Sequence, residues 1–156
     1  MGLERRAIRV TAVVVLLSPD GAAHAVARYE ANRENPEGFH RLIGGGVEFG
    51  ETGEAAVVRE VAEELGAGVH DVVRHAVVES IFDYNGSPAH EIILVHSGRL
   101  DAAAVIPPEG GMLHENGRAI PVEWRPVDAS NVSIPLYPSG IDALIRDLAV
   151  GVGAPG

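Results

Sequence analysis

The fold of this chain is decided by residues 45–67, which read GGVEFGETGEAAVVREVAEELGA. Strong helix formers fill residues 53–65, and Gly66 stands where a helix of that length would end. Apolar residues recur there at the spacing i, i+3, i+4, i+7, at Val58, Val61, Ala62 and Leu65. This period predicts a helix that buries one apolar stripe against a core.

The same helix carries three glutamates close together. On a wheel of about 100° per residue with Glu60 at zero, Glu64 falls near 40° and Glu63 near 300°. The three carboxylates therefore share an arc of about 100°, while the apolar stripe is centred at about 150°. The pattern predicts that the acids face away from the buried stripe.

Three neighbouring carboxylates repel one another unless a cation or a proton relieves them. Hard divalent cations bind carboxylate oxygens, and Mg²⁺ suits sites that combine carboxylates with substrate phosphates. Arg59 lies at the edge of the acidic arc, and Glu51 in the preceding loop is placed to pair with it. Glutamate-rich helix faces are most often simply solvated, so the acids alone do not decide between a surface and a site.

The spacing of the whole segment favours a functional site over a solvated surface. With each residue type near 7% of usage, seven fixed positions match by chance about once in 10⁸ placements. The pattern is a glycine, five residues, Glu, seven residues, Arg-Glu, an aliphatic residue, any residue, Glu-Glu, any residue and Gly. The chain thereby resembles the Nudix hydrolase family at Gly45, Glu51, Arg59, Glu60, Val61, Glu63, Glu64 and Gly66.

The resemblance implies a set of roles. Glu60, Glu63 and Glu64 occupy the family's metal-binding positions, and Gly44 is placed to offer a backbone carbonyl to the metal. Glu51 and Arg59 occupy the positions that orient the carboxylates. The implied cofactor is Mg²⁺, with Mn²⁺ as an alternative. The implied reaction is attack of water on phosphorus, which cleaves a phosphoanhydride bond in a nucleoside diphosphate linked to another moiety. The expected catalytic residues are thus Glu64, Glu60, Glu63, Arg59 and Glu51.

The general base is left open between a box glutamate and a loop acid. In several members of the family the base lies in a loop after the box, and the candidates here are Glu109 and Glu115. The alternative for both is an ordinary surface acid. Arg41, on the strand that enters the glycines, is placed to meet a substrate phosphate or to form a surface ion pair.

The rest of the chain predicts mostly strands. Ser139 is expected to cap a last helix with the stripe Ile141, Leu144, Ile145 and Leu148. The segment 100–119 is too long to be an idle connection, and the glycines 44–46 are expected to end a strand. The fold class is therefore α/β (α+β), a Nudix-like α/β/α sandwich with a mixed β-sheet. The predicted strands are 8–17, 24–29, 39–43, 72–84, 91–96 and 122–125, with a hairpin turn at Asn85-Gly86.

Composition narrows the partners. The 156 residues suit a single domain, expected over 1–150, with a flexible tail at 151–156. The net charge of −10 disfavours binding to nucleic acid. There is no cysteine and no apolar run of about 20 residues, so we expect a cytoplasmic protein with no membrane contact. The resemblance to the Nudix family implies a small-molecule nucleotide substrate. Similarity to dimeric members of the family also allows a homodimer.

Two other functions compete with the hydrolase. The first is a non-catalytic nucleotide sensor on the same scaffold, against which the intact acid triad argues. The second is an interaction domain whose acidic helix is merely solvated, against which the spacing argues. The substrate is not selected: the proline typical of ADP-ribose hydrolases and the extended signature of NADH pyrophosphatases are both missing from their usual places.

Overall fold

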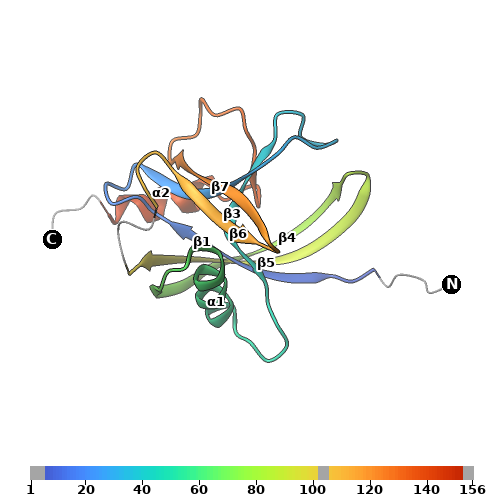
Figure 1. The fold of residues 1–156 in the computed structure, drawn as a ribbon, viewed down its shortest axis with the longest axis horizontal. Helices are drawn as coiled ribbons and strands as arrows, with labels where there is room; N and C mark the ends of the chain where they lie inside the picture. Colours follow the sequence, from blue (N-terminus) through green and yellow to red (C-terminus); the bar gives the residue numbers. More distant parts are fainter. Residues whose placement is uncertain (1–5, 102–105, 153–156) are drawn as a thin grey trace.

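A computed structural model describes residues 6–101 and 106–152 of the chain. Its elements form one mixed β-sheet with a helix on each side (Figure 1). In chain order they are β1 (Arg9–Leu16), β2 (Ala23–Tyr29), β3 (Phe39–Gly46), α1 (Gly53–Leu65), β4 (Val69–Tyr84), β5 (Ser87–Leu100), β6 (Gly111–Glu115), β7 (Arg118–Pro126), β8 (Leu136–Tyr137) and α2 (Asp142–Val150).

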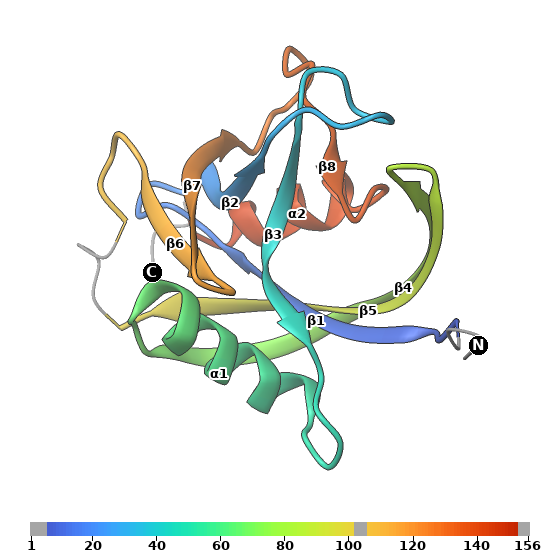
Figure 2. The same ribbon diagram turned by 45° about the vertical axis from the view of Figure 1, so that its right-hand side comes forward.

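The strands follow the order β4-β5-β1-β3-β2-β7-β6, and β8 pairs with β3 outside this path. The pairs β1–β5 and β3–β8 are parallel and the other pairs are antiparallel. Strand β3 joins the two halves of the sheet, because its first residues pair with β2 and its last residues pair with β1. Figure 2 shows β3 crossing between the halves, with the β4–β5 hairpin curling away from it.

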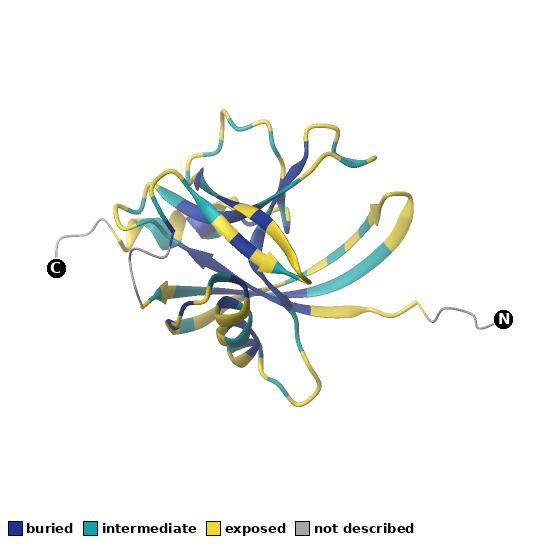
Figure 3. Ribbon diagram, viewed as in Figure 1, coloured by how far each residue is buried: buried dark blue, intermediate teal, exposed yellow. Residues whose placement is uncertain are grey.

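The two helices cover opposite faces of the sheet. Ala12 and Val14 of β1 pack in a cluster with Val57 and Val61 of α1. The alternate residues of β1, such as Val13, pack in a second cluster with α2. Because successive side chains of a strand point to opposite faces, the predicted sandwich and its mixed sheet are confirmed. The buried residues concentrate in the central strands between the helices (Figure 3).

The face that α1 buries differs from the prediction. Val58 is 45% exposed, whereas Val57, Val61 and Glu64 are buried. Two acids therefore lie within or beside the buried arc, since Glu60 and Glu64 are within about 60° of Val57 on the wheel. The expectation that all three acids face away from the core is wrong. The helix instead packs Ala56, Val57 and Val61 against the strands and leaves Val58 outside.

Two further expectations need correction. The glycines do not end the strand at Ile43, because β3 runs on through Gly46 in register with β1. Ser139 does not cap the last helix, whose N-cap is Ile141 without a side-chain hydrogen bond. The segment 100–119, which was expected to be more than a connection, contains a strand, β6, which pairs with β7.

The apolar stripe of α2 is confirmed, since Ile141 and Ile145 are buried and Leu144 and Leu148 pack beside them. No helix in residues 6–101 or 106–152 is long and apolar enough to cross a membrane. Of the predicted C-terminal tail, residues 153–156 lie outside the described residues.

Candidate active site

The acid-bearing helix is fixed at both ends. Thr52 caps it, because the threonine hydroxyl accepts a hydrogen bond of 3.1 Å from the Ala55 N–H. Gly66 closes it in the left-handed conformation with φ 63°, and its N–H donates to the Ala62 carbonyl. Side-chain caps and left-handed glycines satisfy backbone groups that a helix end leaves free. The positions of the glutamates are therefore set by a helix with defined termini.

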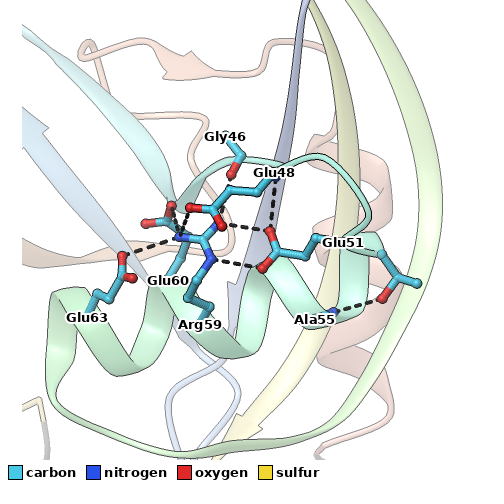
Figure 4. A network of polar contacts seen from close by, with 8 residues as sticks. Gly46, Glu48, Glu51, Ala55, Arg59, Glu60 and Glu63 are labelled. Atoms are coloured by element: carbon cyan, nitrogen blue, oxygen red, sulfur yellow. Dashed lines mark hydrogen bonds and ion pairs between the residues drawn. The ribbon is translucent and has the colours of Figure 1, made fainter.

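Arg59 connects the helix to the glycine loop (Figure 4). Its guanidinium donates two hydrogen bonds to the Glu51 carboxylate, at 2.8 and 2.9 Å, so the pairing expected from the sequence is present. It also donates to Glu60 at 3.0 Å, to Glu63 at 3.3 Å and to the Gly46 carbonyl at 2.9 Å. A planar, always charged guanidinium is suited to holding several acceptors in fixed places.

The electrostatics of this network follow from its contacts. The hydrogen bonds from Arg59 are the main reason that the pKa of Glu51 is lowered to about 2, and the Glu48 backbone adds to them. The carboxylates of Glu51 and Glu60 in turn raise the pKa of Arg59 above its ordinary value. Glu51 thus stays ionised and anchors the guanidinium, which in turn restrains Glu60 and Glu63.

Glu60 and Glu64 face the sheet. Glu64 is only 5% exposed, and a Cβ on Gly45 would lie 2.5 Å from the Glu60 Oε1 atom. The Glu60 carboxylate therefore occupies space that only a glycine leaves free. Burial raises the pKa of Glu64 to about 9, and the hydrogen bond and charge of Glu60 and the charge of Glu115 act in the same direction. Burial beside a second acid therefore opposes the charged form of Glu64.

These residues fit a divalent cation. Their donors are hard carboxylate oxygens, and a bound cation would favour the charged form of Glu64, which burial and the neighbouring Glu60 oppose. In the arrangement seen, no group of three His, Cys, Asp or Glu side chains among the described residues converges as a metal site. Glu63 is turned toward Arg59 and is 59% exposed, so it does not join Glu60 and Glu64. Gly44 lies in the β3 ladder opposite Val13, and its role as a carbonyl ligand stays a prediction.

The two loop acids predicted as candidate bases lie in different places. Glu115, at the end of β6, accepts a hydrogen bond of 3.0 Å from the Tyr29 hydroxyl and is close enough to raise the pKa of Glu64. Glu109 is exposed in the turn that precedes β6. The tertiary structure therefore brings Glu115, and not Glu109, to the acidic helix.

A pocket of about 320 Å³ opens between β3 and the β4–β5 hairpin. Arg41 connects this pocket to the acidic helix, because it lines the pocket and its charge lowers the pKa of Glu64. Apolar walls come from aromatic side chains: Phe39 stacks on Tyr29 and meets Tyr137 edge-on. The remaining lining residues include Arg9, Thr11, Asn35, Phe82, Tyr84 and Glu91.

Most of this lining was not expected from the sequence. One signal in the sequence could have helped. Because residues i and i+2 of a strand share a face, Arg9 and Thr11 could have been predicted to lie on the same side of β1. Asn35 lies in a loop and Tyr137 in a strand of two residues, so neither carries a periodic pattern.

Comparison with known proteins gives the same architecture. The family model described as NUDIX domain matches residues 7–146. A MutT NUDIX hydrolase from Burkholderia pseudomallei aligns with a TM-score of 0.63 at 23% identity, over 91% of this chain and 98% of that protein. A NUDIX hydrolase from Nitrosomonas europaea aligns with a TM-score of 0.61 at 18% identity, over 96% and 93% of the two chains. At these identities the structural likeness shows the fold alone.

Among curated proteins, the chain is similar to the NAD-capped RNA hydrolase NudC of Mycobacterium tuberculosis and Mycobacterium bovis. The identity is 42% over 64 residues, which is 41% of this chain. The matched segment spans only 20% of the length of those relatives.

Proposed function

This chain belongs to the Nudix family, and we propose that it is a pyrophosphohydrolase that cleaves a nucleoside diphosphate linked to another moiety, using Mg²⁺ or Mn²⁺. Substrates of this kind include nucleoside triphosphates and nucleotide sugars. One observation carries the proposal. Arg41 connects the partly buried acidic cluster on α1 to an aromatic pocket, because it lines the pocket and its charge acts on Glu64.

Different residues of the site are assigned to cation binding, to orientation of the carboxylates and to proton transfer. Glu60 and Glu64 would hold the cation, while Arg59 and Glu51 fix the direction of the Glu60 carboxylate. When bound, a divalent cation neutralises the diphosphate and acidifies a water. Glu115 is the proposed general base, because it lies near Glu64 and its own position is held by Tyr29.

The pocket would hold the nucleoside. Phe39 and Phe82 offer apolar ring faces, and a purine or pyrimidine ring packs well against such faces. Arg41 is placed to meet the diphosphate, since it faces both the pocket and the acids. Arg9 adds a second positive charge at the pocket wall.

The test is release of phosphate or of a mononucleotide from a substrate panel, with and without Mg²⁺. The panel holds the common nucleoside triphosphates, several nucleotide sugars, ADP-ribose and NAD. NAD is included because of the local similarity to NudC, although the extended signature of NADH pyrophosphatases is missing. Turnover that depends on Mg²⁺ supports the proposal. Tight nucleotide binding without turnover would favour the sensor, and neither binding nor turnover would favour an interaction domain.

A matched pair of variants tests the base. Glu115→Gln removes a proton acceptor next to Glu64, whereas Glu109→Gln removes an exposed acid of the same segment. We expect Glu115→Gln to lower kcat by about 10²- to 10⁴-fold and Glu109→Gln to leave it unchanged. Equal effects would reject the assignment.

Cytoplasmic location and a homodimer stay predictions. Light scattering after size-exclusion chromatography would test whether the protein is a homodimer.

A further inference from the structure

The loop between β2 and β3 is tied to the tip of the β4–β5 hairpin. The Glu34 carboxylate accepts hydrogen bonds from the backbone N–H groups of Asn85 at 2.8 Å and Gly86 at 2.9 Å. Both turn residues have positive φ, 49° and 79°, as in a two-residue hairpin turn. The two residues lie between the last ladder pair, Tyr84 and Ser87, so their N–H groups are available to an outside acceptor. The bond joins segments that are 51 and 52 residues apart.

The loop that carries Glu34 is itself ordered. The Asn32 side chain accepts a hydrogen bond of 2.7 Å from the Asn35 N–H, and the Gly38 N–H donates to the Asn35 carbonyl. The Tyr137 hydroxyl donates to the Asn35 side chain at 3.1 Å, which fixes the loop to β8. Glu34 therefore reaches the hairpin from an ordered loop. The loop is attached to β8 through Asn35 and to the hairpin through Glu34.

The tie joins two walls of the pocket. Asn35, next to Glu34, lines the pocket on one side, and Asp83 and Tyr84, next to Asn85, line it on the other. Figure 2 shows the β2–β3 loop and the tip of the β4–β5 hairpin near each other, on the same side of β3. Among the described residues, one further hydrogen bond joins this loop to the turn 85–86. It is longer, at 3.4 Å, and runs from the Arg33 N–H to the Asn85 side chain.

We propose that Glu34 is a positioning residue for the substrate pocket: it latches the β2–β3 loop to the hairpin and so holds the pocket in its closed shape. This inference rests on the proposed function for the identity of the ligand. A carboxylate that accepts two N–H groups forms charge-assisted bonds, which are stronger than neutral ones. Because the bonds are exposed to solvent, the latch is weak enough to open for entry and release of a nucleotide.

The expected changes in KM and kcat follow from the fraction of molecules whose pocket is closed. Apparent affinity falls by the fraction of molecules in the competent state, whereas a saturating substrate restores that state. We expect Glu34→Ala to raise KM about tenfold and to change kcat less than about twofold. Glu34→Gln, which keeps one acceptor and loses the charge, should fall between. The control is Glu37→Gln, which removes the same charge from the same loop, where only the backbone carbonyl makes a contact. Its KM should match that of wild type.

A second readout does not need hydrolysis. The chain has no cysteine, so spin labels at Pro36→Cys and Ser87→Cys report the distance between loop and hairpin. We expect a short, narrow distribution in wild type, a longer and broader one with Glu34→Ala, and narrowing again when substrate is added. An unchanged distribution with Glu34→Ala overturns the latch. A changed distribution with unchanged KM overturns its role at the pocket. If wild type hydrolyses nothing in the panel, the proposed function fails, while the distance comparison still decides the latch.

Discussion

The Glu60 carboxylate lies against Gly45, at a place where any side chain would displace it. A Cβ on Gly45 would come within 2.5 Å of Oε1 and 2.9 Å of Oε2 of Glu60. The atoms in the way belong to the end of a flexible side chain, so the fold can adjust by moving the carboxylate. The geometry links a glycine of the loop directly to an acid of the helix.

Gly45→Ala should therefore harm activity more than stability. We expect the melting temperature to fall little and kcat/KM to fall by about 10²-fold, because a small misplacement of a functional group is costly. Enzyme assays and thermal melting on one preparation provide the comparison. Gly111→Ala is the control, since its methyl would meet only Pro107 at an ordinary 3.5 Å. A large fall in the melting temperature of Gly45→Ala would show that Gly45 is needed mainly for the backbone.

Arg59→Ala should release Glu51, Glu60 and Glu63 together. Loss of residues that orient metal ligands typically costs about 10- to 100-fold in metal affinity or activity, and we expect a loss of that size. Arg59→Lys keeps the charge but not the two-pronged contact with Glu51, so it should rescue little. Normal activity in Arg59→Ala would refute the orienting role. A protein that no longer folds would show a mainly structural one.

Glu64→Gln should keep the fold and lose most hydrolysis. Glutamine has nearly the same size, but it can neither carry the charge that holds a cation nor take a proton. Turnover should fall by about 10²- to 10⁴-fold. In chelator, the melting temperature should stay equal or rise, because the substitution removes a carboxyl that burial and Glu60 both oppose in its charged form. Unchanged turnover would remove Glu64 from the active centre.

Mg²⁺ should stabilise the folded protein. A ligand that binds only the native state adds about 2.7 kcal/mol at a hundred times its dissociation constant. Thermal melts with chelator and with millimolar Mg²⁺ measure this for wild type and for a Glu60→Gln, Glu64→Gln double variant. We expect a clear rise in wild type and little in the double variant. Equal rises would place the binding elsewhere.

Acid should destabilise the fold through His24. This side chain is 1% exposed, and its pKa is lowered from 6.5 to about 4, first by burial and then by the charges of Arg125 and His40. Between those two values the unfolded chain binds the extra proton and the folded chain does not. His24 therefore opposes unfolding fully above pH 6.5, and this contribution is lost as the pH falls toward 4, with a slope approaching about 1.4 kcal/mol per pH unit.

Urea unfolding at several pH values between 7.5 and 4.5 measures that slope. The His24→Gln variant should show a flatter dependence on pH, because it has no proton to gain in this window. Parallel curves for the two proteins would assign the acid sensitivity to other groups, among which His40 also has a lowered pKa.

Local signals in the sequence determined the helix 53–65, its end at Gly66 and the turn at Asn85-Gly86. They also determined the pairing of Arg59 with Glu51. Each of these depends on residues that are close in the chain, and backbone preference and helical period are short-range properties. The relative placement of Glu60, Glu63 and Glu64 along the helix follows from the sequence for the same reason.

Tertiary structure alone decided which side of that helix is buried. A helical wheel gives the angles between side chains but not the direction of the sheet, so it placed Glu64 opposite the core when it lies at the edge of it. The choice of Glu115 over Glu109, and the meeting of Glu34 with the hairpin, likewise depend on long-range contacts. Such contacts form between segments that are 50 or more residues apart, and nothing in the local pattern of either segment specifies its partner.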